Sequence, residues 1–142
     1  DEYMIYQARA LGASAVLLIC AILDDGQLGA WRQLAQELGM DALVEAHDER
    51  EIERAAACGA KIIGVNNRNL KDFSVDTANS SRLRALAPES VLFVAESGIS
   101  DPRQVKALKE DGVDAVLVGE TLMRSQNIGQ TFKELRRGGT DA

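Results

Sequence analysis

The sequence is poor in the residues that build aromatic cores and metal sites. Aromatic side chains make up 4% of its 142 residues, and it contains one histidine, two cysteines and two prolines. A core must therefore be built from Val, Leu, Ile and Ala, which suits closely packed parallel strands. The cysteines, Cys20 and Cys58, lack the spacing of metal ligands, so we expect free thiols and no metal.

The sequence also lacks a surplus of positive charge and a long apolar run. Its formal net charge is −6, and the only basic cluster, Arg136-Arg137, lies where a helix C-terminus favours cations. We therefore expect no nucleic-acid partner. Without a membrane-spanning run or a visible signal peptide, we expect no membrane partner and a cytoplasmic location, where thiols stay reduced.

Short apolar runs are the main feature that is present. Each run is typical of a strand buried on both faces, and four of them follow a glycine placed where a helix should stop. The expected strands are Ala15–Ile19, Ala42–Ala46, Ile62–Val65, Val91–Ala95 and Asp114–Val118.

Helical spacing and capping residues predict a helix between successive strands. The expected N-terminal caps are Asp24-Asp25, Asp48 in a capping box with Glu51, Asp76, and Ser100 followed by Asp101 and Pro102. A short helix is expected over Gly119–Met123. The last helix should run from Ile128 to Arg137 and leave residues 138–142 as a frayed tail.

This alternation predicts an α/β fold with parallel strands and right-handed crossovers: one helix followed by five βα units, within a single domain over residues 1–142. The length is too small for a whole (βα)8 TIM barrel, which needs roughly 250 residues. A first helix without its strand, in a sequence that does not start with Met, leads us to expect that something upstream is absent.

Two acidic residues end expected strands at equivalent positions. Glu45 closes the second strand and Glu96 follows the fourth. In parallel α/β folds ligands bind at the carboxyl ends of the strands, and carboxyl groups placed there serve as acids or bases. We therefore predict that this pair is catalytic rather than a solvated surface decoration. His47, two residues after Glu45, is expected to be a helix-entry or supporting residue rather than a catalytic one.

Asn66 and Arg68 follow the strand between these two acids. An amide suits a substrate hydroxyl or carbonyl group, and a guanidinium group holds a carboxylate or phosphate. The alternative for residues 66–69 is turn chemistry, because Asn tolerates left-handed backbone conformations.

The last two strand exits carry glycine. Ser97-Gly98 and Gly119-Glu120 predict a phosphate site, because glycine allows close backbone approach and a short helix follows Gly119. Glu120 does not fit easily, since its charge repels phosphate. We expect its side chain to turn away while its backbone N–H serves.

These residues and their surroundings resemble the indole-3-glycerol phosphate synthase family over essentially the whole chain. The combination of the Asn-Asn-Arg and Glu-Ser-Gly segments is the specific part of the resemblance. The matching segments are Asp1-Glu2-Tyr3 through Gln7-Ala8-Arg9, Gly12–Ile19, Leu43-Val-Glu-Ala-His47, Ile63-Gly-Val-Asn-Asn-Arg-Asn-Leu70, Val94-Ala-Glu-Ser-Gly-Ile99 and Val118-Gly-Glu-Thr-Leu-Met123.

The resemblance implies a partial TIM barrel comprising strands four to eight, the C-terminal portion of one domain. The first three strands, with the family's lysines, have no equivalent here. The implied enzyme is a carboxy-lyase of tryptophan biosynthesis. It closes the ring of 1-(2-carboxyphenylamino)-1-deoxyribulose 5-phosphate and releases carbon dioxide and water. No organic cofactor or metal is implied, and the fragment alone should be inactive or nearly so.

The resemblance also implies a role for each strand-end residue. Glu45 would transfer protons, Glu96 would position the substrate amine as the second catalytic acid, and Asn66 would hydrogen-bond the sugar portion. The implied contacts to the phosphorylated substrate are Arg68, Ser97, Gly98, Gly119 and Glu120.

Two other functions remain open from the sequence. One is another phosphate-binding barrel such as phosphoribosylanthranilate isomerase, which resembles only the last two βα units. The other is a non-catalytic half-barrel acting as an assembly or phosphate-binding module. In either case we expect the chain to self-associate, because the strands at Ala15 and Val116 would be unprotected apolar edges.

Overall fold

Five parallel strands lie side by side in the order of the sequence. They belong to a computed structural model that describes residues 1–69 and 71–140. The elements are α1 (Glu2–Ala10), β1 (Ala15–Ile19), α2 (Asp25–Glu37), β2 (Asp41–Ala46), α3 (Glu49–Ala57), β3 (Ile62–Asn66), α4 (Asn79–Arg84), β4 (Leu92–Glu96), α5 (Pro102–Glu110), β5 (Ala115–Leu117), α6 (Glu120–Arg124) and α7 (Ile128–Gly139).

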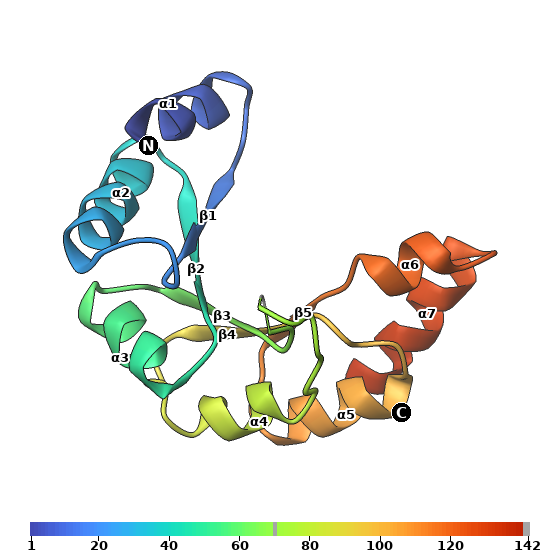
Figure 1. Cartoon of the computed structure of the whole chain (residues 1–142). Coiled ribbons are helices and arrows are strands. Elements are labelled where there is room, and N and C mark those ends of the chain that lie inside the picture. Colours follow the sequence, from blue (N-terminus) through green and yellow to red (C-terminus); the bar gives the residue numbers. More distant parts are fainter. Residues whose placement is uncertain (70, 141–142) are drawn as a thin grey trace.

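The sheet curves, and its helices α2, α3, α4 and α5 lie along the outer side of the curve (Figure 1). Helix α7 packs on α5 at one end, and α1 packs on α2 at the other. The predicted α/β architecture of one helix followed by five βα units is therefore confirmed, and it is an arc of a parallel barrel.

The core lies between the sheet and these outer helices. Leu18, Val44, Ile63 and Phe93 are neighbours in the strand register and are almost wholly buried. They join one apolar cluster with side chains from the helices, of which Leu28 is an example. Trp31 packs against both this cluster and the smaller one around Ile5. The strand alternation then places every second side chain on the opposite, inner face.

Glycine stops the helices where the sequence predicts it. The residues at the ends of α1, α2, α3 and α5 have left-handed backbone, which glycine adopts without strain; they are Gly12, Gly39, Gly59 and Gly112.

Three of the capping predictions are wrong in detail. The cap of α5 is Asp101 rather than Ser100, because Gln104 completes a capping box with Asp101. Helix α4 begins at Asn79, and its N-cap residue, Ala78, makes no side-chain cap hydrogen bond. Asp76 instead forms a turn by accepting a hydrogen bond from Ala78 N. Asp48 does cap α3, but the Glu51 side chain does not accept a hydrogen bond from Asp48 N, which a capping box requires. The Glu51 carboxylate accepts one from His47 N instead.

The expected frayed tail is also partly wrong. Helix α7 continues through Gly139, and Gly138 lies so close to Pro102 of α5 that a Cβ atom would overlap the Pro102 carbonyl group. Small residues therefore let the two helices approach each other. Asp141 and Ala142 lie outside the described residues, as does Leu70.

Both cysteines are free thiols, as expected, in the part of the chain that the structure describes. Burial raises the pKa of the Cys20 thiol to about 12, which makes it unreactive. Among residues 1–69 and 71–140, no helix combines the length and the apolar character needed to cross a membrane.

Candidate active site

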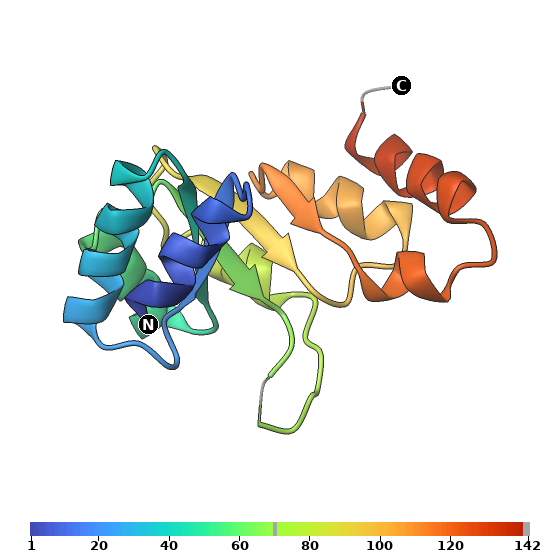
Figure 2. The ribbon, with the colours of Figure 1, turned by 90° about the horizontal axis from the view of Figure 1, so that it is seen from above.

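The three predicted catalytic side chains share the inner face of the sheet. Glu45 pairs in register with Gly64, and Asn66, two residues further along β3, pairs with Glu96. All three therefore lie at the carboxyl ends of their strands, on the side away from the outer helices. Figure 2 shows the strands side by side, with the loop after β3 extending from the same end.

A glycine between the two acids brings them together. Gly64 stands on the central strand β3, and a Cβ atom at this position would overlap the carboxyl group of Glu96. The Glu96 side chain therefore lies over Gly64, beside the Glu45 carboxyl group. Glu45 and Glu96 keep only 4% and 3% of their surface exposed, so the pair is buried even though the inner face is open beside it.

Burial changes the acidity of this pair. Burial is the largest cause and the neighbouring Glu45 carboxyl group the next, and together they raise the pKa of Glu96 to about 8. Two adjacent carboxyl groups cannot both ionise cheaply, so Glu96 holds a proton at neutral pH. Within the described residues, Glu96 Oε1 is a buried oxygen without a hydrogen-bond partner. The arrangement supplies one proton donor and one acceptor side by side.

His47 lies just before helix α3, as expected, and contacts two acids. Its Nε2 atom lies 3.3 Å from Glu45 Oε1, and its Nδ1 atom lies 3.1 Å from Glu51 Oε2. The contact with Glu45 is within ion-pair distance but lacks hydrogen-bond geometry, since Nε2 finds no hydrogen-bond partner in the described part of the chain.

Residues 66–69 form a turn that is built largely by their own side chains. Asn66 Oδ1 accepts a hydrogen bond of 3.0 Å from Arg68 N, and Asn69 Oδ1 accepts one of 2.9 Å from Lys71 N. Asn67 is buried and links Ser97 O to the Ser80 hydroxyl group. Asn66 and Asn69 therefore make local turn contacts, whereas Asn67 bonds to distant residues. None of the three has the left-handed backbone on which the turn alternative was based.

Arg68 connects this loop to α6. Its guanidinium group lies 2.7 Å from Glu120 Oε2, and Arg124 lies 3.0 Å from the other oxygen of the same carboxylate. Two cations therefore neutralise Glu120, which removes much of its repulsion toward a phosphate. These ion pairs do not show whether the Glu120 side chain turns away from a phosphate, so that expectation stays a prediction.

One cavity of about 1160 Å³ collects all five predicted substrate-binding residues. Its lining includes Arg68, Ser97, Gly98, Gly119 and Glu120. Ser97 and Gly98 both have positive φ angles, and a side chain at Gly98 would overlap Val75. Glycine therefore lets the backbone after β4 pack against Val75, which also lines this cavity.

The catalytic acids do not line that cavity. Asn66 lines a smaller one of about 440 Å³, together with His47, Glu51 and Arg68. Arg68 thus lines both cavities. Among the described residues, no group of three or more His, Cys, Asp or Glu side chains is arranged to hold a metal ion.

Several residues that shape the site were not singled out from the sequence. Gly64 interrupts an apolar strand, which is a signal of close approach that the sequence does contain. Ser80 and Asn79 carry no local signal, because Asn67 Oδ1 and His47 O reach them from distant parts of the chain. Glu51 was recognised only as a capping residue.

An arc of parallel strands with helices on its outer side and an acid pair at its carboxyl ends defines a protein of the parallel β/α-barrel class. Comparison with known proteins narrows this class. The model of the family described as "Indole-3-glycerol phosphate synthase" matches residues 1–135. The chain therefore belongs to the indole-3-glycerol phosphate synthase family.

The curated relatives carry the same name. The chain is 55% identical over 136 residues to the indole-3-glycerol phosphate synthase of Lachnoclostridium phytofermentans, with 96% of this chain and 50% of that protein covered. It is 56% identical over 137 residues to that of Lacticaseibacillus casei, covering 94% and 53% respectively. The chain thus spans about half the length of the curated relatives it matches.

Solved structures support the fold. The 3-hexulose-6-phosphate synthase from Salmonella typhimurium superposes with a TM-score of 0.82 at 16% identity, covering 97% of this chain and 67% of that one. At this identity the likeness shows the fold alone.

Proposed function

We propose that this chain supplies the acid pair and the phosphate-binding loops of an indole-3-glycerol phosphate synthase. The substrate would be 1-(2-carboxyphenylamino)-1-deoxyribulose 5-phosphate, and the reaction ring closure followed by loss of carbon dioxide and water. The observation that carries the proposal is the buried Glu45–Glu96 pair, held together over Gly64 on the open face of the sheet.

In this proposal the two acids have different tasks. Glu45 transfers protons during ring closure and dehydration, as a carboxylate that can exchange a proton with its neighbour. Glu96, protonated at neutral pH because of burial, donates a hydrogen bond toward the substrate amine. Asn66 offers its amide to the sugar portion, since only its Oδ1 atom is occupied by the turn.

The phosphate would occupy the cavity of about 1160 Å³. The backbone at Ser97, Gly98 and Gly119 offers N–H groups to an anion, and Arg68 adds a guanidinium group at the cavity wall. Arg124 helps neutralise Glu120, so the neighbouring charge does not oppose binding.

A chimaera tests this function. The chain replaces its matching half of the Lachnoclostridium phytofermentans relative, and the fluorescence of the indole product is followed after substrate is added. We expect turnover. A folded chimaera that binds the phosphorylated substrate without forming indole would favour a non-catalytic half-barrel. Isomerisation without release of carbon dioxide would favour the phosphoribosylanthranilate isomerase alternative.

We also propose that residues 1–142 are the C-terminal portion of one barrel domain and that the isolated chain self-associates. Half coverage of the relatives and five parallel strands support the first statement. For the second, β1 and β5 each pair with one strand only in the described residues. Leu17 and Leu117 on these strands are about half exposed, at 49% and 55%.

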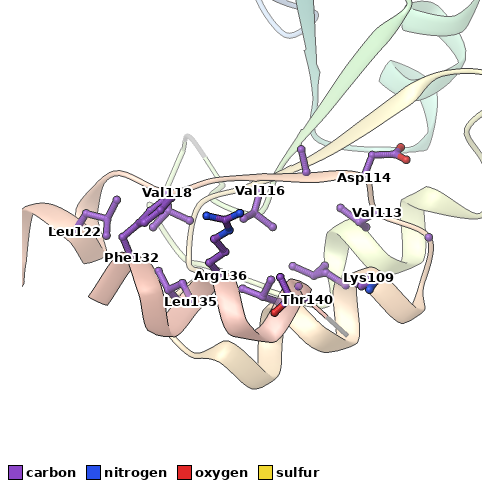
Figure 3. A pocket seen from close by; sticks show the side chains of 15 residues that line it. Lys109, Val113, Asp114, Val116, Val118, Leu122, Phe132, Leu135, Arg136 and Thr140 are labelled. Atoms are coloured by element: carbon purple, nitrogen blue, oxygen red, sulfur yellow. The ribbon is translucent and has the colours of Figure 1, made fainter. Parts of the chain in front are cut away.

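A groove beside β5 supports the same proposal. It has a volume of about 710 Å³ and lies between β5, α5 and α7, away from both acids. Figure 3 shows side chains of α7, including Phe132 and Leu135, and valines of the β5 region facing this space. Apolar lining at a sheet edge suits another strand and helix, from a second copy of this chain or from another segment of a barrel.

The proposal places the enzyme in the cytoplasm. The two free thiols, one buried and one half-buried, are typical of proteins that remain in a reducing compartment.

A further inference from the structure

His47 lies between the site and a third acid that the proposed function does not use. One ring nitrogen, Nδ1, lies 3.1 Å from Glu51 Oε2, and the other, Nε2, lies 3.3 Å from Glu45 Oε1. The ring therefore joins an acid on helix α3 to the buried acid at the end of β2. The His47 side chain keeps 18% of its surface exposed, against 5% for Glu45.

The orientation of the ring is fixed from its base. Glu51 Oε2 accepts a second hydrogen bond, of 2.8 Å, from the backbone N–H of His47 itself. Asp48 accepts from Glu51 N at 2.9 Å, and Asn79 donates to His47 O at 3.1 Å. The loop that carries the ring is thereby tied to both α3 and α4.

These contacts determine where the ring carries hydrogen. Glu51 Oε2 accepts from a backbone N–H, so it acts as a carboxylate acceptor, and Nδ1 must donate to it. Nε2 then faces Glu45 Oε1 in a buried position where the described residues offer it no other partner. The ring and the Glu45 carboxyl group are therefore in close contact, at 3.3 Å, without a hydrogen bond between them.

We propose that His47 is a positioning residue: Glu51 fixes its ring through Nδ1, and the close contact at Nε2 holds the Glu45 carboxyl group against Glu96. The role in turnover depends on the proposed function of Glu45, whereas the arrangement of the ring does not.

The surroundings of His47 give this pair contact with solvent. A cavity of about 440 Å³ opens on the Glu51 side of the ring. The charged groups facing His47 are Glu45 from β2, Asp48 at its own helix entry and Glu51 from α3; Arg68, Lys71 and Asp76 from the loop after β3 line the same cavity. Glu96 lies beyond Glu45 and completes the row of acids.

The first test observes the ring directly. His47 is the only histidine, so the imidazole nitrogen resonances of a labelled chain belong to one residue. We expect Nδ1 to carry hydrogen in the unsubstituted chain and in Glu49→Ala, which removes an exposed acid from the same helix turn. In Glu51→Ala that hydrogen should move to Nε2. A bare Nδ1 in the unsubstituted chain would overturn the proposal.

The second test measures the effect on turnover in the chimaera. His47→Asn places an amide near the Nδ1 position and loses the contact with Glu45, whereas His47→Gln extends an amide toward the Nε2 position. We expect His47→Asn to lower kcat about 10- to 100-fold with KM changed less than about 3-fold, and His47→Gln to recover part of the loss. Trp31 fluorescence confirms that each variant is folded.

The outcomes separate the two proposals. Unchanged kcat and an unchanged pH profile in folded His47→Asn would overturn the positioning role, although the function would stand. An unsubstituted chimaera without turnover would contradict the proposed function, while the imidazole resonances would still decide how the ring is held.

Discussion

At the scale of single residues, the most costly feature is a pair of carboxyl groups buried side by side. Glu45 and Glu96 are almost wholly covered, and each loses most of its hydration. A fold selected for stability alone would fill these positions with apolar side chains. The proposed function thus places the pair where it opposes stability, and the pH dependence of unfolding measures that cost.

The raised pKa of Glu96 predicts that the chain loses stability as pH rises. Its pKa moves from 4.5 to about 8, mainly through burial, so the folded chain keeps a proton that the unfolded chain releases. The contribution is fully present below about pH 4.5 and is lost progressively up to about pH 8. Glu96→Gln mimics the protonated form and should remove this loss.

Urea unfolding followed by Trp31 fluorescence measures this effect. Between about pH 5 and about pH 9, the free energy of unfolding of the unsubstituted chain should fall by on the order of 2–5 kcal/mol relative to Glu96→Gln. The titrating groups outside the Glu45–Glu96 pair are shared by the two proteins and cancel. Parallel pH profiles for the two proteins would contradict a raised pKa.

Gly64→Ala should disturb the pair without changing a charge. The added methyl group overlaps the Glu96 carboxyl group and lies 3.1 Å from Leu43 Cδ1. We expect a loss of about 1–3 kcal/mol in stability, because the close packing has no room for it. Gly29→Ala is the matched control: no atom lies within 4 Å, so the change should raise helix stability by about 0.5–1 kcal/mol. Thermal unfolding of both variants distinguishes them.

At the scale of elements, strands and helices follow from local pattern, but some helix starts do not. The β1 bounds agree with the prediction, because apolar content and glycine define a buried strand locally. Ser100 and Asp101 are both good caps, and the long side chain of Gln104 decides between them through hydrogen bonds to both backbone N–H groups. The start of α4 depends on a distant contact, the hydrogen bonds from Ser80 to Asn67.

The site, too, has features that follow from local sequence and features that depend on distant contacts. The alignment of Glu45 with Glu96 follows from strand order alone, since parallel strands end at one edge. The close approach of the two carboxyl groups depends on register, which places Gly64 beside Glu45. The double role of Glu51 cannot be read locally, because the same spacing also predicts a capping box.

The contact between α5 and α7 gives a prediction at this scale. Gly138→Ala places a methyl group against the Pro102 carbonyl and should destabilise the chain by about 1–3 kcal/mol. Gly139→Ala meets Val105 Cγ1 at an ordinary 3.5 Å and should be neutral or stabilising. Equal melting temperatures for the two variants would show that α7 does not pack as described.

At the scale of the whole molecule, the sheet is an arc whose two outer strands each have one unpaired side among the described residues. The inner face presents leucines as well as acids, and Leu92 and Leu117 are 56% and 55% exposed. Exposed apolar side chains beside unpaired strand edges favour association with another polypeptide.

Light scattering at increasing concentration tests self-association of the isolated chain. We expect dimers or larger species, and we expect Leu117→Lys on the edge strand β5 to weaken them about tenfold or more, because a lysine protects an edge. Leu92→Lys on β4, which is paired on both sides, is the control and should weaken them less. A monomer at every concentration, with ordinary thermal stability, would contradict the proposal.

Turnover by the chimaera tests the central claim, that the Glu45–Glu96 pair performs the proton transfers of indole formation. We expect Glu45→Gln and Glu96→Gln each to lower kcat by about 100-fold or more, while Glu49→Gln, which removes an exposed acid, leaves it unchanged. Indole formation that persists at the unsubstituted rate in Glu45→Gln would contradict the account.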